Sequence, residues 1–283
     1  MIQENYILTE EQIQQFETFG FLVRRQVFNA EEVAEIDEEF SRRRLTILAQ
    51  LNPEEKKNFR QWPIRNPELQ FISSLLEDPR IYGPSEQLIG EDSVLFQSNC
   101  NSYGVDTDWH SDSKDRHLRL IKNVMYLQPT TAERGALRLI PGSHKSPLYD
   151  ELVRIGLDLY VKDQGSYFLK DSEFSGTDIP CYIFSSQPGD VIILNQNTWH
   201  AAYGTFDYRR TCTFNFICNP KTAEEKAEFH VLAERARNRS FNEQPVEGPQ
   251  CHPQWLANPE GNARRARWIK KLEEWGFVEA VKV

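Results

Sequence analysis

The chain has 283 residues, of which 39% are hydrophobic and 27% are charged; this composition is that of a globular protein and excludes a disordered one. The formal net charge of -9 argues against a general nucleic-acid binder, because phosphate backbones require clustered Lys and Arg. No stretch approaches the roughly 20 apolar residues of a membrane span, and the N-terminus lacks the basic and apolar regions of a signal peptide. We therefore expect a cytoplasmic protein.

The five cysteines are scattered, and none forms a CxxC pair. An odd count without an export signal argues against a disulfide framework, and unpaired cysteines argue against a thiolate zinc site. Cys181, Cys212 and Cys218 lie in apolar, strand-like stretches, where we expect small core residues. This cysteine usage is typical of a reducing compartment.

The first 50 residues predict helices. Thr9 is the expected N-cap of the first helix, with Gln12 as its capping-box partner, and Gly20 is expected to end it. Asn29 is expected to cap a second helix. The N-terminal part of the chain, residues 1–90, is therefore predicted to be helical.

Between Val94 and Cys218 the sequence predicts β-structure. Short β-rich stretches separated by turn residues occupy 94–101, 118–128, 136–140, 180–185, 190–194, 198–203 and 208–218. Many short strands at this spacing favour a sandwich or jelly roll over alternating βαβ units. The expected fold is mainly β with flanking helices: a cupin-like double-stranded β-helix with helices packed on the outer face of one sheet.

The remaining segments predict one domain over residues 1–283, with a jelly-roll core at 91–220 and a C-terminal helical part at 221–283. Helix formers favour helices at 221–237 and 263–275, whereas Asn, Pro and Gly favour irregular structure at 239–260. Residues 143–178 are too many for a hairpin and predict an insertion. Both long segments are candidate lids.

One of the six histidines has a carboxylate two residues away in a strand-like context, in Trp109-His110-Ser111-Asp112. Residues i and i+2 of an extended chain point to the same face, so His110 and Asp112 can bind one metal together. An isolated pair of this kind is common on protein surfaces, and a third ligand must come from elsewhere. His200 follows the apolar stretch after Gly189-Asp190. Two histidines and one carboxylate leave coordination positions open, which suits iron(II) oxygenases.

The chain after this distal histidine offers a cation for the same site. If Thr205 and Phe206 form the centre of a hairpin turn, Ala202 opposes Arg209, whereas a register shift of one residue places Arg210 there.

The alternation along the following strand favours Arg209. One face would carry polar side chains and the other apolar ones, namely Arg209, Thr211, Thr213 and Asn215 against Cys212, Phe214, Phe216 and Cys218. A guanidinium near an iron site can bind a dicarboxylate such as 2-oxoglutarate in bidentate fashion. The alternative is that both arginines are solvated charges at a sheet edge.

Further polar residues in strand contexts are candidates for the substrate site. Gln97 and Asn101 share one face of the strand that leads to the His-x-Asp motif. Lys122, which shares a face with Tyr126, is unusual in a buried strand unless it is paired, and it could contact the co-substrate or an anionic substrate group. Ser113 follows the motif, and Arg119 and Arg138 are equally consistent with a surface position. These residues predict a small polar or anionic substrate.

The motifs together resemble those of the phytanoyl-CoA dioxygenase family of iron(II)/2-oxoglutarate oxygenases, over most of the chain. The resembling segments are the opening helix (Leu8–Phe16 with Phe19–Gly20–Phe21), the proximal metal motif (Asp108–Asp112), the mid-roll signature (Gly135–Leu137 with Ile140–His144) and the distal motif (Pro188–His200, then Arg209). Two features depart from the family pattern. Ala202 stands where many members have Ser, and the loop before Arg209 is short, which keeps Arg210 as an alternative.

The resemblance implies a catalytic iron(II) site on His110, Asp112 and His200. It also implies that Arg209 binds 2-oxoglutarate, and Lys122, Asn101 and Thr211 are candidates for further contacts with this co-substrate. The implied reaction is hydroxylation of an unactivated C–H bond of a small metabolite by O2, with release of succinate and CO2. The retained Asp112 argues against halogenation.

Other functions remain consistent with the same residues. One is a non-catalytic sensor or interaction protein that keeps the fold and binds the metal and 2-oxoglutarate. Another is an oxygenase that uses iron without an oxoacid. The expected partner is a small-molecule substrate, with no nucleic acid and no membrane, and the chain is expected to be a monomer or a homodimer.

Overall fold

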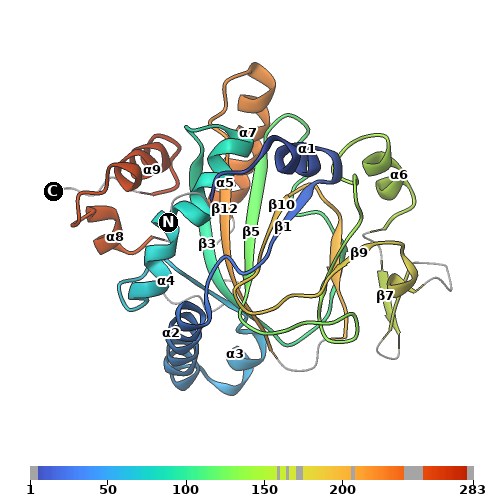
Figure 1. The fold of residues 1–283 in the computed structure, drawn as a ribbon, viewed down its shortest axis with the longest axis horizontal. Coiled ribbons are helices and arrows are strands. Elements are labelled where there is room, and N and C mark those ends of the chain that lie inside the picture. The colour runs from blue at the N-terminus through green and yellow to red at the C-terminus, as the bar shows by residue number, and fades with distance from the viewer. Residues whose placement is uncertain are drawn as a thin grey trace.

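The computed structural model describes residues 6–157, 160–163, 166–169, 175–204, 208–238 and 251–278. Within them, two antiparallel sheets form the centre of the molecule (Figure 1). The larger sheet has the order β1 (Phe21–Arg24), β10 (Val191–Asn195), β5 (Leu120–Tyr126), β12 (Arg209–Ile217), β3 (Val94–Tyr103) and β2 (Gln61–Pro63). The smaller sheet has the order β4 (Thr107–His110), β11 (His200–Ala202), β6 (Leu137–Leu139) and β9 (Tyr182–Phe184). The predicted mainly β architecture is confirmed.

The helices flank these sheets, as expected. They are α1 (Glu10–Phe19), α2 (Ala30–Gln50), α3 (Pro53–Asn58), α4 (Gln70–Ser74), α5 (Pro79–Ile89), α6 (Leu148–Arg154), α7 (Ala223–Asn238), α8 (Pro253–Ala257) and α9 (Ala263–Glu274), with single 3-10 turns at Leu75–Glu77 and Gly176–Asp178. The predicted capping boxes at Thr9 and Asn29 are both present, and Gly20 ends α1 in the left-handed conformation. No helix in the described ranges has the length and apolarity needed to cross a membrane.

Alternation along the strands divides the apolar residues between two layers. Ile193 and Phe214 belong to the large cluster shared by the six-stranded sheet and the helices of both ends of the chain, including α2, α5 and α9. Ile192 and Val124 point the other way and pack with residues of β6 and β9, between the two sheets. Helices therefore cover one face of the larger sheet, as predicted, and leave the opposite face for the interior of the roll.

The cysteines are all free thiols. Cys212 and Cys218 lie in the large core cluster, as predicted. Cys181 differs: it is half-buried at the border of the cluster on the outer side of the smaller sheet.

Several elements differ from the sequence-based expectation. The seven predicted strands are all present, and β1, β2, β4, β7 (Tyr160–Asp163) and β8 (Ser166–Leu169), each of three or four residues, are additional. The expected irregular stretch 239–260 contains the helix α8, and residues 239–250 lie outside the described part. Segment 143–178 contains α6 and a two-stranded sheet of β7 and β8. That residues 1–283 form a single domain, with 143–178 as an insertion in it, stays a prediction.

Asp190, at the start of β10, fixes the chain that enters the larger sheet. Its carboxylate accepts hydrogen bonds from the backbone N–H of Gln187 and of Gln26, both at 2.9 Å, and pairs with Arg25 at 2.6 Å. Burial alone would raise the pKa of this carboxyl, but these hydrogen bonds outweigh burial and hold the pKa below its usual value. The ionised form of Asp190 therefore stabilises the folded chain.

We expect Asp190→Asn to lower the free energy of unfolding at pH 7 by about 1–3 kcal/mol, the usual contribution of hydrogen bonds to a buried charged group. Because the folded-state pKa is depressed, this stabilisation is complete above pH of about 4 and is lost as the pH falls through the folded-state pKa. Urea unfolding of both proteins between pH 7 and pH 3 should show the difference shrinking with acid. The exposed Asp150→Asn is the control and should have a smaller effect; a pH-independent Asp190→Asn difference would contradict the assignment.

Candidate metal centre and its pocket

Two short strands of the smaller sheet bring the metal-ligand candidates together. β4 and β11 pair antiparallel with His110 directly opposite His200, and their ring centroids are 4.3 Å apart. Directly opposed side chains of an antiparallel pair share a face, so both imidazoles point into the space between the sheets. A register irregularity follows His200, where the pairing moves on to Ala202 and Thr107. The contact between residues 90 positions apart thus depends on one local strand pairing.

Asp112 completes a cluster just beyond the end of β4. Its carboxylate oxygens lie 3.8 Å from Nε2 of His110 and 3.5 Å from Nε2 of His200. One donor atom from each of the three residues lies within 4.8 Å of the others. Atoms that bind one ion at about 2.0–2.2 Å stand roughly 3–4 Å apart, so the spacing is close to that of a mononuclear site. Among the described residues, His110, Asp112 and His200 are the group of His, Cys, Asp or Glu side chains whose donor atoms lie close enough together to hold one metal ion.

The histidines are held in the tautomer that a metal needs. Nδ1 of His110 lies 2.7 Å from the carbonyl oxygen of Asp108, and Nδ1 of His200 lies 2.8 Å from that of Thr198. A carbonyl only accepts, so each Nδ1 donates and each Nε2 keeps its lone pair for the cluster. Burial, together with the neighbouring His110, lowers the pKa of His200 to about 3, so this imidazole is neutral. The donor set fits a divalent ion.

Lys122 of β5 supplies a positive charge from the opposite sheet. Its Nζ pairs with Asp112, and both side chains are 21% exposed. Burial alone would raise the pKa of Asp112, but Lys122 and the two histidines hold it well below its usual value. Asp112 is therefore ionised, and the expectation that a Lys in this strand must be paired is met.

The two arginines of β12 lie on opposite faces. Arg209 is 4% exposed and lines the pocket, where its Nη2 donates to the carbonyl oxygen of Val105 at 3.1 Å and to Oγ1 of Thr107 at 2.9 Å. Arg210 points away from the pocket and pairs with Asp37. The alternating polar and apolar faces predicted this difference.

The predicted hairpin, in which Ala202 opposes Arg209, is wrong. β11 pairs with β4 and β6 in the smaller sheet, whereas β12 pairs with β3 and β5 in the larger sheet. The chain therefore crosses from one sheet to the other between His200 and Arg209, and the turn residues 205–207 lie outside the described part. Crossing between sheets is typical of a jelly roll, and a one-sheet hairpin cannot represent it.

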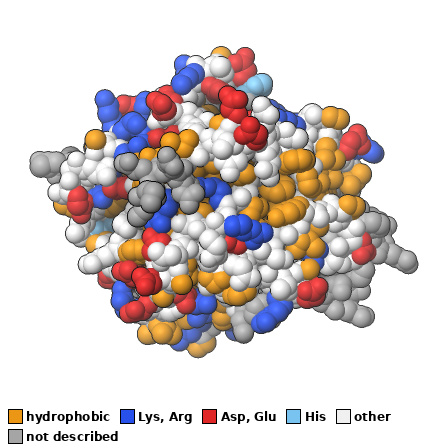
Figure 2. Space-filling view, viewed as in Figure 1, with side chains coloured by type: hydrophobic (Ala, Val, Ile, Leu, Met, Phe, Trp, Pro, Cys, Tyr) orange, Lys and Arg blue, Asp and Glu red, His pale blue; other side chains and the backbone are white. Residues whose placement is uncertain are grey.

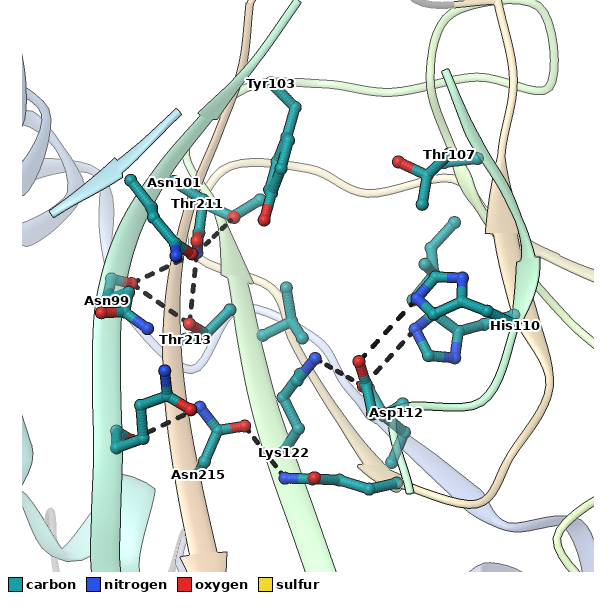
Figure 3. A pocket seen from close by; sticks show the side chains of 18 of the residues that line it. Asn99, Asn101, Tyr103, Thr107, His110, Asp112, Lys122, Thr211, Thr213 and Asn215 are labelled. Carbon is teal, nitrogen blue, oxygen red and sulfur yellow. Dashed lines mark hydrogen bonds and ion pairs between the residues drawn. The ribbon is translucent and has the colours of Figure 1, made fainter. Parts of the chain in front are cut away.

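A cavity of about 380 Å³ lies between the sheets and contains the metal cluster. Seven further residues that the sequence predicted line it: Gln97, Asn101, Ser113, Lys122, Tyr126, Arg209 and Thr211. Figure 3 shows the two walls of this pocket, with amide and hydroxyl side chains of β3 and β12 across from His110 and Asp112. Two predicted residues lie elsewhere. Arg119 pairs with Glu17, and Arg138 donates to the carbonyl oxygen of Ala132 on the outer side of the smaller sheet.

Sequence reasoning missed several residues of the pocket. Asn99 and Tyr103 continue the face of Gln97 and Asn101, so the alternation of the strand could have identified them. Gln196 follows β10, and Leu232 lies on α7, and no periodic signal points to either. Of the described residues in 143–178, none lines the cavity, so α7 is the helix that reaches it.

The chain was compared with known proteins. It is 26% identical over 157 residues to an ectoine dioxygenase of Bordetella bronchiseptica, covering 49% of this chain and 50% of that protein. It is 28% identical over 160 residues to a probable alpha-ketoglutarate-dependent hypophosphite dioxygenase of Stutzerimonas stutzeri, covering 50% of this chain and 55% of that protein. The matched part thus spans about half the length of these curated relatives.

The fold is also that of a solved structure, HygX from Streptomyces hygroscopicus with nickel and 2-oxoglutarate bound. The TM-score is 0.57 at 21% identity, over 75% of this chain and 88% of HygX. The family model "Phytanoyl-CoA dioxygenase (PhyH)" matches residues 16–211, which is more than half of the sequence. The chain therefore belongs to the phytanoyl-CoA dioxygenase family.

Proposed function

We propose that this protein is an iron(II)- and 2-oxoglutarate-dependent dioxygenase that hydroxylates a C–H bond of a small molecule. The observation that carries the proposal is the convergence of His110, Asp112 and His200 in the same cavity as the buried Arg209. In the overall reaction the substrate, 2-oxoglutarate and O2 become the hydroxylated product, succinate and CO2. Family membership and the dioxygenases among the relatives support this class.

His110, Asp112 and His200 would hold the iron, which supplies the oxygen chemistry when it is bound. The Nδ1 hydrogen bonds to backbone carbonyls fix the ring orientation of both histidines, so that each Nε2 faces the same point. Lys122 orients the Asp112 carboxylate from the opposite sheet. Three ligands on one side leave the other side free for the co-substrate and for O2.

Arg209 would bind the distal carboxylate of 2-oxoglutarate. Its Nη2 is anchored by Val105 and Thr107, and among the described residues Nε and Nη1 make no hydrogen bond, so the N–H groups of these two nitrogens are available to a carboxylate. Asn101 and Thr211 lie beside this end of the pocket and are further candidates for the co-substrate. Thr211 lines the same cavity as Ala202, from the opposite sheet, and is our candidate for the hydrogen bond that a Ser at position 202 would make.

We also propose that the substrate is a small molecule and not a nucleic acid, and that the chain works in the cytoplasm as a monomer or a homodimer. Acidic and basic side chains are interspersed on the face seen in Figure 2 and do not gather there into a basic patch. The net charge of -9 points the same way. Of the substrate candidates, Gln97, Ser113 and Tyr126 keep this role because they line the cavity.

The test is a measurement of succinate formed from 2-oxoglutarate. The anaerobic protein is loaded with Fe(II) and 2-oxoglutarate, supplied with a panel of small candidate substrates, and exposed to O2. An enzyme should form many equivalents of succinate per protein. The formation should require iron, and a true substrate should increase it. A sensor should bind both ligands without exceeding one equivalent. Substrate oxidation without 2-oxoglutarate would instead support an oxygenase that needs no oxoacid.

A further inference from the structure

The wall of the pocket opposite the metal cluster is polar but almost free of charge. β3 and β12 place four directly opposed pairs on it: Tyr103 and Arg209, Asn101 and Thr211, Asn99 and Thr213, Gln97 and Asn215. The wall extends over six residue steps, about 20 Å at the rise of a β-strand. Only its first pair carries a charged side chain.

The other charged groups around the cavity already have partners. Apart from the metal-ligand candidates, the ionised residues that line its described part are Lys122 and Arg209. Lys122 sits next to Asn215 in the sheet, but its ammonium is paired with Asp112. Arg209 is at the far end of the wall and is assigned above to the co-substrate. No charged side chain is thus left over at the Asn99 and Asn215 end among the described residues.

Part of this wall is rigid. The Asn101 amide nitrogen lies within hydrogen-bond distance of three acceptors: Oγ1 of Thr211 at 3.3 Å, Oγ1 of Thr213 at 3.2 Å and the carbonyl oxygen of Asn99 at 3.3 Å. At the other end, the amide nitrogen of Gln196 donates to Oδ1 of Asn215 at 3.0 Å. These contacts hold hydroxyl and amide groups in place before any ligand arrives, which lowers the entropy cost of binding.

Asn99 stands between these two rigid groups and is not satisfied. Its residue is 4% exposed, it lines the cavity, and its Oδ1 has no hydrogen-bond partner among the described residues. Such a buried unpaired group destabilises the empty site. Because this oxygen is buried beside the cavity, a turn of the Asn99 side chain toward a ligand hydroxyl or amide hydrogen would satisfy it. Figure 3 shows Asn99 beside Thr213 on the wall that faces the metal ligands.

Resting on the proposed function, we infer that the substrate is a small, neutral, polyhydroxylated ring of the monosaccharide or cyclitol type, held by Asn99, Gln97 and Asn215. Adjacent hydroxyls match the donor and acceptor of an amide side chain. An ionised group here would lose its hydration, and no charged side chain among the described lining residues is left to pair with it. Phe96 and Leu232 line the same cavity and offer apolar contact to the ring carbons. The 380 Å³ volume must also hold the co-substrate, which limits the substrate to a small molecule.

Calorimetry on the anaerobic protein loaded with Fe(II) and 2-oxoglutarate tests this inference. The probes are methyl glucopyranoside and myo-inositol as neutral rings, methyl glucuronide as the anion and methyl glucosaminide as the cation. We expect a neutral ring to bind at least tenfold more tightly than either charged analogue. A charged analogue that binds as tightly or more tightly overturns the inference, and so does the absence of binding by both neutral rings.

Two variants of one residue link the result to the wall. Asn99→Leu should weaken neutral-ring binding at least tenfold, and by far more than it changes 2-oxoglutarate affinity. Asn99→Asp keeps the shape and should move the preference toward the glucosaminide. The control is Gln128→Leu, because the Gln128 side chain binds Arg210 on the other face of the sheet. Equal losses in Asn99→Leu and Gln128→Leu would contradict the site.

The same experiment separates this inference from the proposed function. Loading is followed by the visible charge-transfer absorption of the iron–2-oxoglutarate chelate, which is independent of the sugar probes. If this band does not form while a neutral ring still binds, the proposed function fails and the ring site stands. If the band forms while neither neutral ring binds, the ring site fails and the proposed function stands.

Discussion

A His110→Ala protein should lose stoichiometric iron binding. His110 provides one of the three ligand candidates found in the described part of the chain, and its removal leaves Asp112 and His200 of that group to hold the ion. Loss of an outer hydrogen-bond partner already weakens metal sites by about 10–100-fold, so loss of a direct ligand should weaken iron by at least about 100-fold. Anaerobic titration with Fe(II), read by bound metal per protein, measures this change, and succinate formation should fall to background.

The control for this variant is His230→Ala. His230 lies on the exposed side of α7, where its side chain is 70% exposed and its Nε2 lies 3.6 Å from a carboxylate oxygen of Glu234. Its replacement should leave one iron per protein, and circular dichroism should show the same fold for both variants. One tightly bound iron in His110→Ala would rule out the assigned triad.

An Arg209→Ala protein should need at least about 30-fold more 2-oxoglutarate for half-maximal binding. Removing one partner of a desolvated charge pair costs about 2 kcal/mol or more, because the carboxylate is then left buried without its partner. The carbonyl oxygen of Val105 and the hydroxyl of Thr107 would also lose the guanidinium that donates hydrogen bonds to them. Titration of the charge-transfer band with 2-oxoglutarate measures the shift.

Arg210→Ala is the matched control for Arg209→Ala, since it removes the same side chain from the next position. Arg210 pairs with Asp37 outside the cavity, so the 2-oxoglutarate requirement should change less than about threefold. A strong effect of Arg210→Ala together with a weak effect of Arg209→Ala would reverse the assignment of the two arginines.

Local patterns predicted the parts of the molecule that depend on neighbouring residues. Thr9 and Asn29 form the expected capping boxes because a cap involves only the next three residues. The inward position of Arg209 followed from the alternation along its own strand. The same rule, applied through to the end of β3, would have added Asn99 and Tyr103 to the predicted site.

Patterns did not predict which strands pair. The proposed hairpin between Ala202 and Arg209 follows from sequence proximity, but the two residues belong to different sheets. Arg119 and Arg138 were candidates only because charged residues are unusual in strands. The partner of Arg119, Glu17, lies far away in the sequence and is brought near by the tertiary structure alone. Arg138 instead donates to the carbonyl oxygen of Ala132, in the segment just before β6, on the outer side of the sheet. Gln196 reaches the cavity through a position that no periodicity marks.

The pairing of β4 with β11 has a further consequence for the protein as a thermodynamic system. β4 is an edge strand of the smaller sheet, and β11 is its one neighbour there in the described chain. An ion held by His110 and His200 would act as a cross-link between this edge and the rest of the sheet. The coupling is reciprocal. Binding of the ion stabilises the ordered edge by a certain free energy, and ordering of the edge strengthens the binding of the ion by the same amount. Fraying of these four residues would thus lower the affinity for the metal.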